Sequence, residues 1–338
     1  MRKPVVLVTG AAGEIGHALI YQLASEDQSA IVTVDLKPLD KQLERRVMRA
    51  FTGSILDKSL LENILAEFAV DQVFHLAALL STRAEFTPVT AHQVNVEGTL
   101  NLLEFAQAQG RSHGRQVLFF YPSSIAAYGV DPDADDGTPI RENEATRPIT
   151  MYGCNKLYCE HLGRYYARFY KQLDAEQPSG RVDFRAIRFP GLISAFTVPS
   201  GGTSDYASEM IHAASQSEPY SCFVRPDTRI PFMAMPDAVA AILELARAPH
   251  ENLSQLVYNI SAFNPSAQAI RQLVLHAFPG AEISFKPDHK RQAIVDSWPQ
   301  AVDDSAARAD WGLNPKYDLS RAFNDYLIPH ISKRYESG

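Results

Sequence analysis

The stretch that most constrains the fold is a glycine-rich turn between an apolar strand and a helix. Residues 5–9 (Val-Val-Leu-Val-Thr) read as a strand buried on both faces, and Gly10, Gly13 and Gly16 follow at once. This spacing permits a tight bend, brings the backbone close to a pyrophosphate, and points the amino terminus of a helix at that anion. An ordinary glycine turn is the alternative interpretation.

A carboxylate at the end of the next strand favours the nucleotide interpretation. The strand over residues 31–34 ends in Asp35, about twenty residues beyond the glycines, where an acid accepts hydrogen bonds from an adenosine ribose. Asp35 also repels a 2′-phosphate, so NAD is favoured over NADP, although Lys37 leaves a case for NADP. Together, strand, glycine turn, helix, strand and acid predict a dinucleotide-binding unit.

Strands and helices alternate through the amino-terminal half, which predicts an α/β fold. The expected architecture is a doubly wound parallel sheet (Rossmann) with a smaller carboxyl-terminal substrate lobe, because irregular Pro/Gly-rich stretches come later. We expect residues 1–180 to form the NAD-binding domain and residues 181–338 mainly the substrate lobe, with some segments returning to the sheet. Further strands are expected at residues 49–51, 72–76, 117–121 and 184–189.

A tyrosine and a lysine four residues apart indicate acid-base chemistry. Tyr152 and Lys156 lie on one face of a predicted helix, where a cation lowers the pKa of a phenol from its ordinary ~10 toward the working range. Because this spacing arises often by chance, a solvated surface pair is the alternative. Ser123 and Ser124 end the fifth predicted strand, and a polar strand end is the plain reading of that pair.

Composition and charge exclude several classes of function. The chain has 338 residues, 46% of them hydrophobic, and a net charge of −7, so we expect neither nucleic acid nor anionic membranes as partners. Cys154, Cys159 and Cys222 show no zinc or redox spacing, and we expect no metal and a reducing, cytoplasmic setting. The apolar run at the amino end is too short for a signal peptide, and no segment approaches the ~18 apolar residues of a membrane span.

The motifs together resemble the extended short-chain dehydrogenase/reductase superfamily, of the NAD-dependent epimerase/dehydratase type. They are Gly10-x-x-Gly13-x-x-Gly16, Asp35, residues 75–78 (His-Leu-Ala-Ala), residues 95–99 (Asn-Val-Glu-Gly-Thr), residues 123–129 and Tyr152-Gly153-x-x-Lys156. The resemblance implies that Ser124 orients the substrate oxygen, Tyr152 is the acid/base, and Lys156 binds the nicotinamide ribose and tunes Tyr152. The chain departs from the pattern at Ser54, where these proteins often have an aspartate. The implied NAD contacts are Gly10, Gly13, Glu14, Ile15, Gly16, Asp35, Ser54, Ile55, Leu76, Ala77, Ala78, Asn95, Tyr152, Lys156 and Phe189.

Residues 201–207, 227–238, and 291–299 together with 303–305, resemble more narrowly the short-chain L-threonine 3-dehydrogenases. The implied reaction is NAD-dependent oxidation of the 3-hydroxyl of L-threonine to 2-amino-3-ketobutyrate, with Tyr152 as base. The chain departs from that family at Ser200, Ser204 and Ala234. The substrate contacts expected are Ser81, Ser124, Gly191, Thr203, Asp205, Tyr206 and Arg229.

Three other functions stay open at this stage. A dehydrogenase of a small sugar acid such as D-erythronate needs only a carboxylate pocket, whereas a nucleotide-sugar epimerase or dehydratase usually has an arginine clamp where this chain has Ile230. An inactive NAD-binding regulator keeps the glycine turn but not the chemistry. The candidate carboxylate partners, each of which also fits a surface ion pair, are Arg185, Arg188, Arg229 and Arg291.

The resemblance also implies a homodimer. In resembling proteins the helices that begin near Gly98 and Tyr152 pair across a dimer interface. Their apolar stripes also suit an ordinary core, so the sequence leaves both interpretations open.

Overall fold

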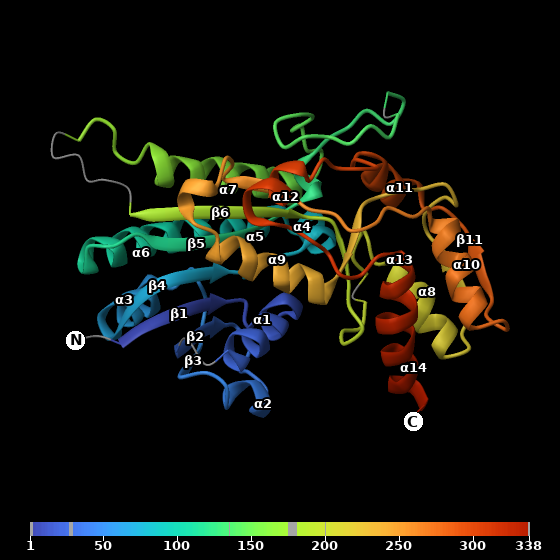
Figure 1. Cartoon of the computed structure of the whole chain (residues 1–338), viewed down its shortest axis with the longest axis horizontal. Helices are drawn as coiled ribbons and strands as arrows, with labels where there is room; N and C mark the ends of the chain where they lie inside the picture. The colour runs from blue at the N-terminus through green and yellow to red at the C-terminus, as the bar shows by residue number, and fades with distance from the viewer. Residues whose placement is uncertain (1–2, 27–29, 135, 175–180, 200, 337–338) are drawn as a thin grey trace.

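The computed structural model describes residues 3–26, 30–134, 136–174, 181–199 and 201–336, which places Ser200 outside the described residues. A parallel sheet runs through the molecule in the order β10-β6-β5-β4-β1-β2-β3, with the carboxyl ends of its strands at the right in Figure 1. The expected doubly wound sheet is confirmed. Its strands are β1 (Lys3–Thr9), β2 (Ala30–Asp35), β3 (Arg49–Thr52), β4 (Phe68–His75), β5 (Val117–Ser124), β6 (Val182–Phe189) and β10 (Val257–Asn259).

Helices cover both faces of the sheet, because alternate side chains of each strand point to opposite sides. In β1, Val6 and Val8 join a core with α1 (Glu14–Ser25) and α9 (Met235–Arg247). Val5 and Leu7 of the same strand join the opposite core. That second core is closed by α3 (Lys58–Glu67), α6 (Gly98–His113) and α7 (Met151–Arg168).

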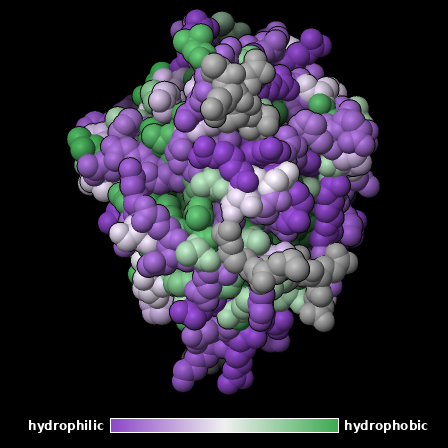
Figure 2. All heavy atoms as spheres, turned by 90° about the vertical axis from the view of Figure 1, so that its left-hand side faces the viewer, coloured by the Kyte–Doolittle hydropathy of each residue, from purple (hydrophilic) through white to green (hydrophobic). Residues whose placement is uncertain are grey.

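Short elements connect the sheet to its helices, and most follow the carboxyl ends of strands. The opposite face of the molecule, where the strands begin, is mainly hydrophilic, with apolar residues showing between the polar ones (Figure 2). The short elements are α2 (Lys41–Glu44), α4 (Ser81–Phe86), α5 (Pro88–His92), the π-helix η1 (Gln93–Glu97), and the 3-10 turns η2 (Ile125–Ala127) and η3 (His250–Asn252).

A smaller lobe lies beyond the carboxyl ends of the strands, at the right in Figure 1. Two parallel strand pairs, β7 with β9 and β8 with β11, pack with helices around a third apolar core. Its elements are β7 (Gly191–Ile193), α8 (Tyr206–Ser215), β8 (Tyr220–Cys222), β9 (Phe232–Ala234), α10 (Ala267–Ala277), β11 (Ile283–Phe285), α11 (His289–Asp296), α13 (Leu319–Arg321), η4 (Ala322–Leu327) and α14 (Ile328–Glu336). Helix α12 (Ser305–Trp311) instead packs on the sheet domain, beside β10.

The later chain contributes two strands to the sheet. The sequence predicts β6, whereas β10 is only three residues long and too short for a periodic signal. The domain boundary at residue 180 stays a prediction. Among the described residues, no helix combines the length and the apolar character needed to cross a membrane.

Candidate active site

The glycine turn has the close contacts that a pyrophosphate cradle needs. Gly10 has a φ of +69°, and a Cβ there would lie 2.5 Å from the nitrogen of Ala77, after β4. A Cβ on Gly16 would lie 2.4 Å from the Gly10 oxygen, so α1 packs against the turn itself. Gly13 is the N-cap of α1 and has no side chain to cap the first N–H groups. An uncapped helix amino terminus beside a bare backbone turn fits the pyrophosphate of NAD.

Asp35 lies beside this turn with its carboxylate held in place. One oxygen accepts a hydrogen bond from the nitrogen of Ala12 at 2.9 Å, and the other accepts one from the nitrogen of Lys37 at 2.9 Å. The carboxylate is therefore oriented by two backbone groups, one of them in the glycine turn. This arrangement fits the adenosine ribose contact that the sequence predicts.

Replacing Asp35 by Asn is expected to weaken the preference for NAD over NADP by about tenfold, because the neutral amide no longer repels a 2′-phosphate. The ratio of kcat/KM values for the two cofactors measures this change. Asp318→Asn is a matched control, since Asp318 also accepts a backbone hydrogen bond, from Arg321, at the start of a helix far along the chain. A parent protein that used NADP as well as NAD would show that Asp35 has another role.

The other predicted cofactor residues occupy different environments. Asn95, inside the π-helix η1, holds the loop after β4 by accepting from the nitrogen of Leu79 at 2.7 Å and donating to its oxygen at 3.0 Å. Such π-helical turns occur often at functional sites. Glu14 accepts a hydrogen bond from Thr197, which ties the glycine turn to the loop after β7. Ile55 is buried against Gly98 at the start of α6. Of the remaining positions, Ser54 accepts from the nitrogen of Leu56, Ile15 and Leu76 pack against the core beside α1, and Phe189 is buried.

Ser124, Tyr152 and Lys156 lie on the two elements that meet where α7 begins and β5 ends. Thr150 caps α7 by accepting from the nitrogen of Gly153 at 3.0 Å. A Cβ on Gly153 would lie 2.0 Å from the oxygen of Ala126, so the first turn of α7 touches η2 directly. Ser124 is the last residue of β5, immediately before η2. Gly153 thus permits the close approach of α7 to η2.

Burial controls the electrostatics of the tyrosine and the lysine. Lys156 donates from Nζ to the oxygen of Pro122 at 2.5 Å and lies 5.3 Å from the centre of the Tyr152 ring. Desolvation lowers the pKa of Lys156 to about 8 and raises the pKa of Tyr152 well above its ordinary value. The sequence expectation that the neighbouring cation lowers the Tyr152 pKa is therefore wrong for the cofactor-free protein, because the loss of hydration dominates.

His75, just behind the site, is a structural residue. Its Nδ1 lies 2.8 Å from the hydroxyl of Thr9 and its Nε2 lies 2.9 Å from that of Thr99. Burial lowers the pKa of His75 to about 3, so the ring is neutral. It joins β1, β4 and α6 through hydrogen bonds that need no charge.

The loop over residues 201–205 packs against the start of α4. The hydroxyl of Thr203 donates to that of Ser81 at 3.3 Å, and Thr82 donates to the oxygen of Gly201 at 3.0 Å. Asp205 accepts from the nitrogen of Gly202 at 2.6 Å. The structure thus brings together two stretches that the sequence predicts to contact substrate.

Other predicted substrate residues lie in different surroundings. The Tyr206 ring is fully buried, with its centre 6.0 Å and 5.8 Å from those of Phe223 and Phe232, and its hydroxyl has no hydrogen-bond partner among the described residues. A Cβ on Gly191 would lie 2.7 Å from the Phe232 ring. Tyr206 therefore packs in the core of the lobe.

The candidate arginines divide by burial. Arg185 donates to Asp183 and to carbonyls at the end of α9, and Arg188 forms an ion pair with Glu160, so both guanidinium groups are buried and paired within the fold. Arg229 is exposed and donates to the oxygen of Asn264 at 3.0 Å. Arg291 donates to the oxygen of Gly202 at 2.8 Å, beside the substrate loop.

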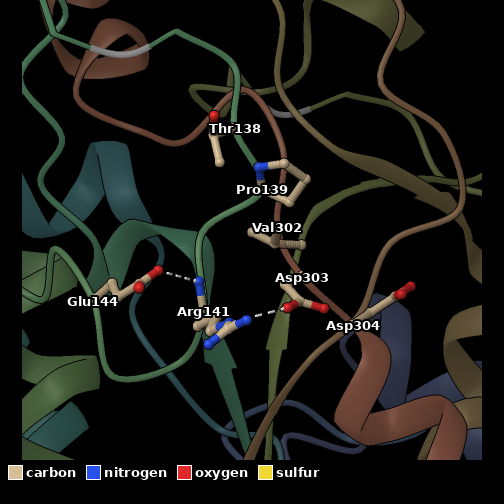
Figure 3. Close-up of a pocket in the computed structure, with 7 residues that line it drawn as sticks. All are labelled: Thr138, Pro139, Arg141, Glu144, Val302, Asp303 and Asp304. Atoms are coloured by element: carbon tan, nitrogen blue, oxygen red, sulfur yellow. Dashed lines mark hydrogen bonds and ion pairs between the residues drawn. The ribbon is translucent and has the colours of Figure 1, made fainter.

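Two cavities lie elsewhere in the described part of the molecule. The larger, about 540 Å³, contains the Arg141–Asp303 ion pair, and Glu144 accepts from the Arg141 nitrogen (Figure 3). The smaller, about 110 Å³, adjoins the ion pair of Arg225 with Asp296. Neither cavity is lined by Ser124, Tyr152 or Lys156.

Residues 6–261 match the model of the NAD dependent epimerase/dehydratase family, which covers the glycine turn, Asp35, Tyr152 and Lys156. The chain belongs to this family. Membership makes the protein an NAD-dependent enzyme, as the sequence predicts. The cradle at Gly10 to Gly16 is the part of the structure that fits NAD.

Within the family, this chain is similar over nearly its whole length to proteins named L-threonine 3-dehydrogenase and to uncharacterized members. The chain is 34% identical over 331 residues to "L-threonine 3-dehydrogenase, mitochondrial" of Bos taurus, which covers 97% of this chain and 83% of the bovine protein. It is also 34% identical to an uncharacterized epimerase/dehydratase of Staphylococcus haemolyticus over 98% of this chain and 99% of that protein. A monomeric L-threonine 3-dehydrogenase from a metagenome, in its apo form, is 35% identical, with a TM-score of 0.84 over 98% of this chain and 100% of the other. Since that relative is monomeric, the homodimer stays a prediction.

Proposed function

We propose that this protein oxidises the 3-hydroxyl of L-threonine to 2-amino-3-ketobutyrate, with NAD as the hydride acceptor. The observation that carries the proposal is the agreement with proteins named L-threonine 3-dehydrogenase over nearly the whole chain. One stretch that resembles them, residues 201–207, lies against Ser81 at the start of α4. The resembling stretch therefore lies between the substrate lobe and the sheet domain of this chain.

Three side chains of this chain would carry out the proton chemistry. Tyr152 takes the proton of the substrate hydroxyl, and Ser124 holds the same oxygen by a hydrogen bond. Burial keeps the Tyr152 phenol protonated in the cofactor-free protein, so its ionisation requires positive charge nearby. Lys156 provides one such charge, 5.3 Å from the centre of the ring. NAD, when bound, accepts the hydride that leaves the carbon bearing the hydroxyl.

Charge and hydroxyl groups at the substrate loop suit an amino acid. The hydroxyl of Ser81, which accepts from Thr203 at 3.3 Å, keeps its own hydrogen to donate to a carboxylate. The Asp205 carboxylate, held by Gly202, is an acceptor for an ammonium group. We assign these residues to the two charged ends of threonine.

The environment of Ile230 and its neighbours argues against a nucleotide-sugar substrate. Ile230 is fully buried at the position where resembling epimerases have an arginine. The adjacent Arg229 donates instead to a backbone oxygen at Asn264. A diphosphate would therefore lack its bidentate partner at this position.

A substrate panel tests the proposal directly. We expect L-threonine with NAD to give the highest kcat/KM, followed by L-allo-threonine and L-serine, and NAD to be preferred over NADP. Reduction of NAD is followed by nicotinamide absorbance, with the Tyr152→Phe protein, purified in the same way, as the control for contaminating enzymes. Preferential oxidation of D-erythronate, or turnover of a UDP-sugar, would replace the proposed substrate, and inactivity with the whole panel would favour an NAD-binding regulator.

A further inference from the structure

A buried ion pair lies directly behind the proposed catalytic residues. Arg188 on β6 donates from Nε to one oxygen of Glu160 at 2.9 Å and from Nη2 to the other at 2.6 Å. Each side chain is only 4% exposed. Removing two charges from water costs about as much as their attraction returns, so stability alone does not account for such a pair.

The ion pair is joined to the strand that carries Ser124. Ser123, itself buried, donates from its hydroxyl to the Glu160 oxygen that also accepts from Arg188 Nε. The preceding residue, Pro122, accepts from Lys156. Two neighbouring residues at the end of β5 are therefore held by two successive turns of α7.

The spacing on α7 explains why these contacts bear on the site. Tyr152, Lys156 and Glu160 are four residues apart, so they lie along one face of the helix. Arg188 is held from its other side, since it donates from Nη1 to the oxygen of Glu142 at 2.7 Å, and its guanidinium lies 4.6 Å from the centre of the Tyr128 ring. Glu160 thus connects α7 and the end of β5 to an anchored group on β6.

We propose that Glu160, held by Arg188, is a positioning residue that fixes α7 against the end of β5 through Ser123, and so sets the place of Ser124 relative to Tyr152 and Lys156. The kinetic consequence rests on the proposed function. The structural consequence concerns only residues of this chain, so it can be measured without a substrate.

Ser123→Ala is the sharpest test, because it removes the link to β5 and leaves the ion pair in place. With whichever alcohol of the panel the parent oxidises, we expect kcat to fall about tenfold while both KM values stay within about twofold, since a small misplacement costs rate more than binding. Ser297→Ala is the matched control, because Ser297 is also buried and its hydroxyl donates to the oxygen of Ile294 at 2.7 Å. Ser123→Thr restores the hydroxyl and should recover most of the lost kcat.

A double variant removes the ion pair itself. Glu160→Gln alone leaves a buried arginine without its anion and is expected to lower the Tm, so Glu160→Gln is combined with Arg188→Met. If the double variant folds with a Tm near that of the parent, we expect the same loss of kcat as in Ser123→Ala. Parental kcat in a folded double variant would overturn the inference.

Amide hydrogen exchange on the NAD-free protein separates this inference from the proposed function. In Ser123→Ala, exchange should become several-fold faster at residues 124–127 and 151–154, while the parental rates persist in α9 and at the control position. Parental exchange in these two segments overturns the inference, even if kcat changes. A parent that ignores L-threonine refutes the proposed function, whereas the exchange result still decides whether Glu160 positions these segments.

Discussion

Tyr152→Phe is expected to lower turnover by ~10²-fold or more while NAD binding persists, because it removes the phenol oxygen and keeps the ring. Tyr152 is the side chain that we assign to take the substrate proton. The Tyr121 ring of β5 also lies near Lys156, at 4.7 Å, but Tyr121 is buried, whereas Tyr152 is only partly buried. Steady-state kinetics with L-threonine measure turnover, and quenching of protein fluorescence by the dinucleotide measures binding.

Tyr158→Phe is the matched control for this variant. Tyr158 lies on the same helix, and its side chain is exposed. The loss of its hydroxyl should therefore leave kcat within about twofold of the parental value. Activity of Tyr152→Phe within a few fold of the parent would falsify the assignment of the base. Loss of NAD binding in that variant would instead assign the phenol to cofactor contact.

Gly153→Ala is expected to lower turnover by ~10²-fold and to destabilise the fold by about 1–3 kcal/mol. The added Cβ would lie 2.0 Å from the oxygen of Ala126 and 2.8 Å from Cβ of Pro148. The first turn of α7 must therefore move away from η2, which separates Tyr152 from Ser124. The sign of the stability change is informative, because replacing Gly by Ala inside a helix ordinarily stabilises a protein by about 1 kcal/mol.

Chemical denaturation and steady-state kinetics measure the two effects of Gly153→Ala. Gly280→Ala is the control, since a Cβ at Gly280 meets no atom within 4 Å and the residue has no positive φ. A Gly153→Ala protein that was more stable than the parent and fully active would show that the close approach of α7 to η2 does not set the site.

Local pattern was sufficient to predict the sheet and the nucleotide turn. The strand that begins the chain, the glycines after it and Asp35 are close in sequence, and their spacing specifies backbone geometry directly. The sequence also places Tyr152 and Lys156 on one helical face, because the helical period is fixed. It misses β10, whose three residues pair with β6 only because the later chain folds back on the sheet.

The backbone turns and the reactive groups of this chain can be read from its sequence, whereas the surroundings of those groups follow only from the fold. The sequence makes Arg188 a candidate partner for the substrate carboxylate, but in the fold its guanidinium is paired with Glu160. Tyr206 is a candidate contact that packs in the core, and the Tyr152 pKa rises where the motif alone predicts a fall. The physical reason is that burial, and with it pKa and hydrogen-bond occupancy, is a sum over neighbours from distant parts of the chain, which no local spacing contains.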